Sequence, residues 1–345
     1  MENRRIEMSI PNDSERNNSI DIFRFISALL VIAIHTNPMT EINPYLGYLC
    51  SQICPRVAVP FFFCVSGYYY IGKLEKTTNK KEIITEFKKT FLSYLKIYFF
   101  WSVVYVVCDY KQYFYEGVSD WGAIIGIVLN FLVYGTYYHL WYFIGIFFSL
   151  IIVTLCYLIR VEKILAYFSV ILYLAGVLSC AYYQIGNRIP IFSLLISSSY
   201  FTVIRRVILM ALPFFMMGYF IPKISNKKVP IKLVLTGALF VGEIIVVNIF
   251  ELSLNVIETV FLYVFLAYII VWLVHHPLQK KKRTGKICRY LSSFIYFSHP
   301  LFLMIITQLG ITENTIVFIL TALFSTATGL ILIKINNKTL NQFIA

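Results

Sequence analysis

Residues 20–38 read Ile-Asp-Ile-Phe-Arg-Phe-Ile-Ser-Ala-Leu-Leu-Val-Ile-Ala-Ile-His-Thr-Asn-Pro and form the first of eleven long apolar runs in a chain of 345 residues. A helix needs about 20 mostly apolar residues to cross a bilayer. The composition agrees, because 59% of the residues are hydrophobic and 14% are charged, against about 25% charged in soluble domains. The sequence therefore predicts an all-α polytopic membrane protein and excludes a soluble globule. The other runs lie at about residues 57–72, 91–109, 122–138, 140–159, 164–183, 207–221, 232–249, 257–274, 291–309 and 315–333.

The positions of the 30 Lys and Arg residues predict how the chain crosses the membrane. Basic residues collect in cytoplasmic loops, yet eleven full crossings would put the basic segments 73–89 and 280–289 on opposite sides. We therefore expect about ten transmembrane helices plus one re-entrant or partial helix at residues 122–138, a short run that Gly126 and Gly135 interrupt. Both termini are then cytoplasmic, with 23 basic residues inside and five outside. The five are Arg56, Lys111, Arg188, Arg205 and Arg206.

This topology also sets the expected domains, location and partners. We expect a cytoplasmic tail at residues 1–19, a transmembrane domain at residues 20–334 and a cytoplasmic tail at residues 335–345, in a multi-pass protein of the cell membrane. The cytoplasmic loops explain the net charge of +13, so the lipid bilayer is the expected partner and nucleic acid is not. Cys50 and Cys54 are four residues apart in the sequence, so they can form a disulfide or remain two free thiols. Because no His lies beside them in the sequence, we expect no metal site there.

Three ionisable residues share one face of the first expected helix, although such residues cost several kcal/mol at membrane depth. At about 100° per residue, the eleven steps from Arg24 to His35 end about 20° past three full turns, and Asp21 lies on the same side. The same steps rise about 16 Å along the axis. In one interpretation Asp21 and Arg24 form an interfacial pair and His35 is a core residue. In the other, Arg24 begins a track for an anionic substrate that enters from the cytoplasm, and His35 moves a proton at the far end.

Several other polar residues are candidates for binding a substrate. Lys88, Lys89 and Lys96 lie where the chain re-enters the membrane, and they either join Arg24 in binding phosphates or form the basic flank of a helix. His299 precedes Pro300, which frees backbone carbonyls inside a helix and indicates a cavity wall.

Two further candidates are expected toward the outer face. The run from His139 to Trp141 serves either as an interfacial anchor or as part of a site. Glu243 is expected to pair with Arg205 or Arg206, or to carry a proton.

The spacing and order of these motifs resemble the acyltransferase-3 family of integral membrane proteins. The likeness covers nearly the whole chain. Its most specific element is Arg24, ten further residues and His35. Four supporting motifs follow in the order of the family: Phe61-Phe62-Phe63-Cys64-Val65-Ser66-Gly67-Tyr68, His139-Leu140-Trp141, the Phe-rich segment from Phe214 to Tyr219, and Tyr296-x-x-His299-Pro300.

The resemblance implies an enzyme with no bound cofactor that passes an acyl group, with acetyl as the expected group, from cytoplasmic acyl-CoA to a hydroxyl of a small or cell-surface acceptor. Arg24, held in place by Asp21, and the Lys cluster would meet the CoA phosphates, and His35 would act as general base. One departure weakens the likeness: where the family often has Arg-x-x-Arg, this chain reads Ser93-Tyr94-Leu95-Lys96.

Within the family, the sequence as a whole is most similar in its pattern to the amino-terminal membrane domain of the serine racemases of Gram-positive vancomycin resistance. That likeness implies a role at the bacterial cell wall, with serine as an acceptor. The end of the chain at Ala345 is compatible with a cut before a cytoplasmic racemase domain. A competing interpretation is a transporter of serine, with Glu243 and His299 lining the path. A passive membrane anchor would explain the helices but not the buried charges.

Overall fold

The structure is a computed structural model that describes residues 17–114, 119–253, 258–278 and 282–335. The two expected tails therefore fall almost wholly outside the described residues, as do residues 279–281 of the basic segment expected in the cytoplasm. Every regular element of the described part is helical, which confirms the all-α fold.

All eleven apolar runs form helices. Nine helices of the described chain are long and apolar enough to cross a membrane. Two further apolar helices are shorter: α5 together with η5, and α13. The bounds are α1 Asn18–Thr36, α2 Pro44–Tyr48, η2 Leu49–Ile53, η3 Cys54–Val57, α3 Ala58–Leu74, α4 Lys80–Cys108, η4 Tyr110–Gln112, α5 Asp120–Leu129, η5 Asn130–Tyr134, α6 Trp141–Leu158, α7 Glu162–Ser179, α8 Tyr183–Gly186, α9 Pro190–Ser197, α10 Phe201–Ile204, η6 Arg205–Ala211, α11 Leu212–Phe220, η7 Ile221–Lys223, α12 Val229–Ile249, α13 Val260–His275, α14 Lys282–Gln308 and α15 Asn314–Ile335.

The run at residues 122–138 is one of the two short helices. It forms α5 and the π-helical turn η5, which together span Asp120–Tyr134, about 22 Å of helix against a hydrocarbon core of about 30 Å. The turn ends at Gly135, whose φ of 88° belongs to the left-handed region that glycine adopts without strain. The expectation of an incomplete helix here is therefore confirmed in its length.

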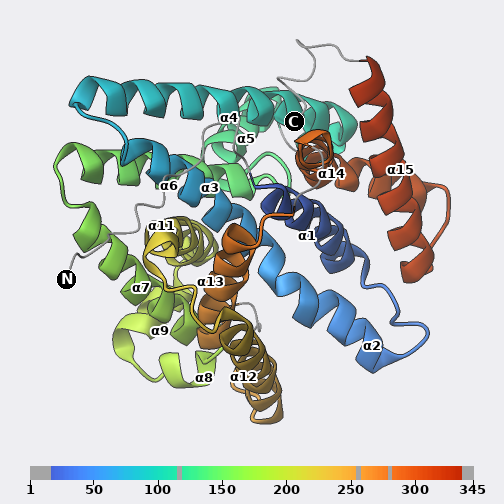
Figure 1. The fold of residues 1–345 in the computed structure, drawn as a ribbon. Helices are drawn as coiled ribbons and strands as arrows, with labels where there is room; N and C mark the ends of the chain where they lie inside the picture. The colour runs from blue at the N-terminus through green and yellow to red at the C-terminus, as the bar shows by residue number, and fades with distance from the viewer. Residues whose placement is uncertain (1–16, 115–118, 254–257, 279–281, 336–345) are drawn as a thin grey trace, which may run out of the picture.

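Helix α1 lies in the middle of the bundle, with α4 and α15 at its edges (Figure 1). It packs most extensively against α14 and also contacts α3, α15 and α13. At one end of the bundle the connections after α3, α6 and α11 border a common pocket that contains Lys80, Arg160, Lys163 and Lys223. These three connections were expected to share one side of the membrane, and the fold places them together.

Two glycines allow the closest helix crossing near the centre of the bundle. A Cβ atom at Gly67 of α3 would overlap the carbonyl of Phe215 in α11, and one at Gly218 of α11 would overlap the backbone of Tyr68. Small residues allow transmembrane helices to approach this closely. The two Phe-rich motifs of the sequence, which contain these glycines, are therefore the two faces of one helix crossing.

Candidate active site

The polar stripe of α1 connects two groups of polar side chains that lie at different depths in the bundle. We call Asp21, Arg24 and Arg289 the arginine cluster and His35, His139 and His299 the histidine cluster. Each cluster combines residues of α1 and α14, and the connection before α6 adds His139 to the second.

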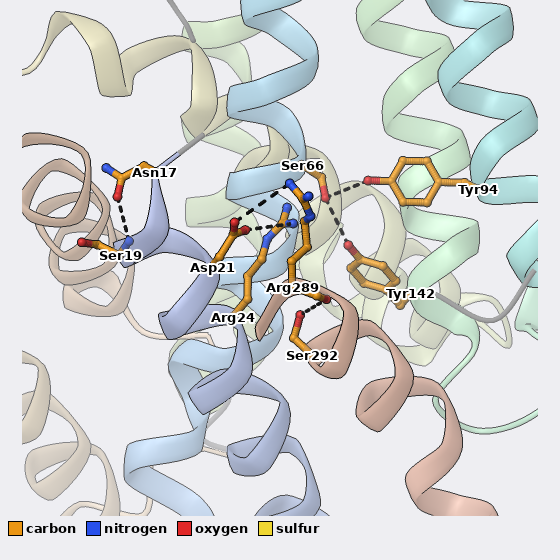
Figure 2. Close-up of polar contacts among 9 residues, drawn as sticks. All are labelled: Asn17, Ser19, Asp21, Arg24, Ser66, Tyr94, Tyr142, Arg289 and Ser292. Carbon is orange, nitrogen blue, oxygen red and sulfur yellow. Dashed lines mark hydrogen bonds and ion pairs between the residues drawn. The ribbon is translucent and has the colours of Figure 1, made fainter. Parts of the chain in front are cut away.

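The arginine cluster lies just inside the first turn of α1, which Asn17 caps by accepting a hydrogen bond from the Ser19 amide. Asp21 is buried, and its two carboxylate oxygens lie 4.0 Å from Arg24 Nη1 and 4.0 Å from Arg289 Nη1 (Figure 2). The expected pair of Asp21 and Arg24 is confirmed, but it is not a simple interfacial pair. Arg24 keeps 16% of its side chain exposed, and its Nε makes no hydrogen bond to a described residue.

Three hydroxyl groups lie beside the arginine cluster in the close-up view (Figure 2). Tyr94 of α4 donates a hydrogen bond to Ser66 Oγ at 3.1 Å, and Ser66 Oγ lies 3.3 Å from the hydroxyl of Tyr142 in α6. The Arg24 guanidinium also lies 5.8 Å from the ring centroid of Tyr69 in α3. The cations are therefore surrounded by neutral hydroxyls and aromatic rings, with one carboxylate between them.

The histidine cluster unites three residues that the sequence singled out separately. The His35 and His299 rings stack with centroids 5.4 Å apart, and the His139 ring lies 5.4 Å from that of His299. His139 and His299 are buried, whereas His35 is partly exposed. His139 is thus enclosed within the bundle, whereas Trp141, a residue of this run suited to an interfacial anchor, is only partly buried. No group of three or more His, Cys, Asp or Glu in the described residues is placed to hold a metal ion.

The proline of α14 determines how His299 is oriented. Pro300 has no amide hydrogen to donate to the Tyr296 carbonyl, and His299 Nδ1 lies 2.8 Å from that oxygen and 3.2 Å from the Ile295 carbonyl. Because carbonyl oxygens only accept, Nδ1 must carry the proton and Nε2 is left as an acceptor. Nε2 is buried and has no hydrogen-bond partner among the described residues.

A pocket of about 480 Å³ opens beside the histidine cluster, at the end of α1. His35, Thr36, Tyr138 and Pro300 form its wall next to the cluster, and residues of α14 and α15 complete it. The expectation that Pro300 borders a cavity is confirmed. His35 is thus the member of the cluster that a molecule in this pocket reaches.

Helix α14 repeats the pattern of α1. Arg289, Tyr296 and His299 follow at intervals of seven and three residues, so they share one face of α14. The ten-residue separation of Arg289 and His299 nearly equals the eleven residues between Arg24 and His35. Because the two arginines meet at Asp21 and the two histidines stack, α1 and α14 run parallel with their stripes facing each other. Arg289 was not predicted as a site residue, because it was counted with a cytoplasmic loop.

Comparison with known proteins identifies the family. The profile described as an acyltransferase domain matches residues 17–334. The chain belongs to the acyltransferase-3 family.

Curated relatives of this acyltransferase-3 chain include two proteins from enterococci. An "Amino-acid racemase" of Enterococcus faecalis is 31% identical over 222 residues, which cover 61% of this chain and 30% of the relative. A "Serine/alanine racemase" of Enterococcus gallinarum is 25% identical over 302 residues, which cover 83% of this chain and 40% of the relative. The chain thus spans less than half the length of these relatives. No solved structure matches it.

Three predicted residues of the acyltransferase-3 chain lie apart from both clusters. Lys88, Lys89 and Lys96 are exposed on α4, and none of them forms an ion pair within the described residues. The expectation that they extend the phosphate-binding group around Arg24 therefore has no support in the contacts, and their exposure is typical of a basic helix flank.

The expectation that Glu243 pairs with an arginine was wrong. Its carboxylate accepts hydrogen bonds from the amides of Val260 and Phe261 at 2.8 Å each and from the Tyr182 hydroxyl at 2.9 Å. A carboxylate at the start of a helix satisfies free amides and complements the helix dipole. Arg205 forms its ion pair with Glu258 instead. Glu258 was not among the residues that the sequence predicted for a site. Cys50 and Cys54 are both free.

Proposed function

We propose that this protein moves an acyl group, in the first place acetyl, from cytoplasmic acyl-CoA to a hydroxyl group of a small or cell-surface acceptor. The observation that carries the proposal is the pair of parallel stripes on α1 and α14, each with an arginine at one end and a histidine at the other. The family membership supports acyl transfer as the reaction class.

The arginine cluster is the proposed site for the phosphates of CoA. The cluster presents two guanidiniums on either side of one carboxylate. Guanidinium groups bind phosphate with two parallel hydrogen bonds. In acyl-CoA the pantetheine arm separates the phosphates from the thioester. On α1 an axial rise of about 16 Å separates Arg24 from His35, so the phosphates would lie at Arg24 and the thioester toward His35.

His35 is the proposed general base. A neutral imidazole removes the proton from the acceptor hydroxyl while that oxygen attacks the thioester carbonyl carbon. The carbon–sulfur bond then breaks, and the CoA thiolate leaves and takes up the proton. His139 and His299 surround the reacting end with buried rings.

The racemase names of the relatives support a narrower version of this proposal. In that version the acceptor is serine, and a cytoplasmic racemase domain acts in the same process of vancomycin resistance at the cell wall. Transport of serine remains the alternative. Two hydrogen bonds from the first turn of α13 disfavour the transporter, because they occupy the carboxylate of Glu243, which was expected to line the transport path.

Release of free CoA thiol from acetyl-CoA tests the proposal, with purified protein alone and with L-serine, and His35→Ala as the comparison. We expect release that the variant loses. The matched control is His276→Ala, because His276 lies at the end of α13 and stacks on Trp272 outside both clusters. No release by the wild type, together with uptake of labelled serine into proteoliposomes, would instead establish transport.

A further inference from the structure

The pocket bordered by the connections after α3, α6 and α11 belongs to neither cluster of the candidate active site. It encloses about 480 Å³, and pockets that bind small molecules measure about 300–1,000 Å³. We call it the loop pocket. Its walls combine apolar side chains, such as Leu74 and Ile83, with charged ones. The charged residues are Glu75, Lys80, Arg160, Glu162, Lys163 and Lys223.

The basic side chains of the loop pocket outnumber its carboxylates. Lys223 Nζ lies 4.0 Å from a carboxylate oxygen of Glu75. Lys80, Arg160 and Lys163 form no ion pair with any residue that the structure describes. A position on the expected cytoplasmic side explains why basic residues gather at this end of the bundle. It does not explain why they line a cavity.

The end of α6 supplies two further observations, both at residues that line the loop pocket. Tyr157 Oη is buried without a hydrogen-bond partner among the described residues, which costs free energy. Arg160 has a φ of 60°, at the position after a helix that glycine usually occupies because it adopts this conformation without strain. The amides of Arg160 and Val161 close α6 by donating to the carbonyls of Tyr157 at 3.3 Å and Cys156 at 2.9 Å. The chain thus keeps a strained arginine at the wall of a pocket, and such strain concentrates at functional sites.

Helix α3 connects the loop pocket to the arginine cluster. The Tyr69 ring centroid lies 5.8 Å from the Arg24 guanidinium, and Glu75 of the pocket follows six residues later, just after α3 ends. Six helical residues rise about 9 Å. In acyl-CoA the adenosine ribose carries a further phosphate, on the side of the pyrophosphate away from the pantetheine arm. A donor with its pyrophosphate at the arginine cluster and its thioester toward His35 therefore has its adenosine on the side of the loop pocket.

We propose that the loop pocket binds the ribose phosphate of acyl-CoA, through the side chains of Arg160 and Lys163 and the hydroxyl of Tyr157. A guanidinium offers phosphate two parallel donors, and Tyr157 gains the acceptor that it lacks. The inference rests on the proposed function for the identity of the donor. It adds a second phosphate site to the arginine cluster, so the two ends of the CoA phosphates are held by different helices.

A ligand that lacks only this phosphate tests the inference. CoA and dephospho-CoA are titrated by calorimetry into the full chain in phosphatidylcholine nanodiscs. We expect the wild type to bind CoA about ten-fold or more tightly than dephospho-CoA, the factor that corresponds to a charge-assisted hydrogen bond. Arg160→Gln should lose this preference and bind dephospho-CoA as the wild type does. Lys227→Gln is the matched control, since Lys227 is exposed, lies outside the loop pocket and changes the net charge equally.

Two further variants separate binding from folding. Arg160→Gly removes the side chain and relieves the backbone strain. It should therefore lose the preference for CoA while its melting temperature is no lower than that of the wild type. Tyr157→Phe should reduce the preference by about two-fold to ten-fold, the factor for a hydrogen bond between a neutral donor and its acceptor.

The inference is overturned if the wild type shows no preference for CoA over dephospho-CoA, or if Arg160→Gln keeps the preference. Release of CoA thiol in the transfer assay would then leave the proposed function standing. Native mass spectrometry in nanodiscs that contain phosphatidylglycerol covers the other source of phosphate. Retention of that lipid by the wild type but not by Arg160→Gln, with equal binding of CoA, would assign the pocket to a lipid headgroup and overturn the inference too. A preference that depends on Arg160, without any transfer, would support the pocket and refute the proposed function alone.

Discussion

The two stacked histidines differ in their bonds, so their replacement should have different consequences. We expect His35→Ala to abolish activity and leave the melting temperature unchanged, because His35 is half-buried and makes no hydrogen bond to a described residue. His299→Ala should also lower the free energy of unfolding by about 1–3 kcal/mol, since it leaves the buried Tyr296 carbonyl without its donor. His299→Asn restores a donor and should recover stability. A His35→Ala protein with a lower melting temperature and normal turnover would instead assign His35 to packing.

The two arginines at Asp21 should contribute alike to binding of CoA. Arg24→Lys and Arg289→Lys each lose a bidentate hydrogen bond to phosphate, so we expect CoA affinity to fall about 10-fold to 150-fold, the equivalent of 1.5–3 kcal/mol. Calorimetric titration of CoA measures the change, and high salt should weaken the wild type too. Lys96→Gln is the control, because Lys96 is exposed on α4 and should not matter. Equal affinity of wild type and Arg24→Lys would remove Arg24 from the donor site.

At the scale of the helix, periodicity predicts which residues share a face but not which helix that face meets. The stripe of Asp21, Arg24 and His35 was predictable because all three lie within one apolar run. Arg289 was not found, since α14 begins at Lys282 and its first turns are basic. The same period, applied upstream of His299, would have placed Arg289 on its face. The pairing of Arg205 with Glu258 joins residues 53 positions apart, and no local pattern contains that information.

The crossing of α3 and α11 allows a prediction with an internal control. Gly67→Ala should destabilise the protein by about 1–3 kcal/mol, the usual cost of overpacking, because the new methyl group would meet the Phe215 carbonyl. Gly242→Ala in α12 meets no atom within 4 Å, and alanine favours a helix over glycine by up to about 1 kcal/mol. Thermal unfolding in detergent measures both. A neutral Gly67→Ala would mean that α3 and α11 are not held at this close distance.

Across the whole molecule, the basic residues fall into two groups whose positions have different physical explanations. Most basic residues lie in the connections and tails expected in the cytoplasm, where they set the orientation of the helices. The few expected on the outer side include Arg56, Arg205 and Arg206, which are partly buried, and Arg205 pairs with the buried Glu258. Orientation explains the first group, whereas the second has to be explained by binding or by structure.

The orientation of the chain is the last prediction, and it follows from this separation. The basic segments require one run that does not cross in full, and we assign it to α5 with η5, so the chain before and after it should lie on the same, outer side. Alkaline phosphatase fused after Lys111 and after His139 should therefore be active in both fusions, and a fusion after Ala345 should be inactive. A fusion after Lys80 is the control for a cytoplasmic position, because Lys80 belongs to the basic pocket at the other end. If the fusions at Lys111 and His139 report opposite sides, α5 crosses the membrane, and the 23 inner and five outer basic residues must be assigned again.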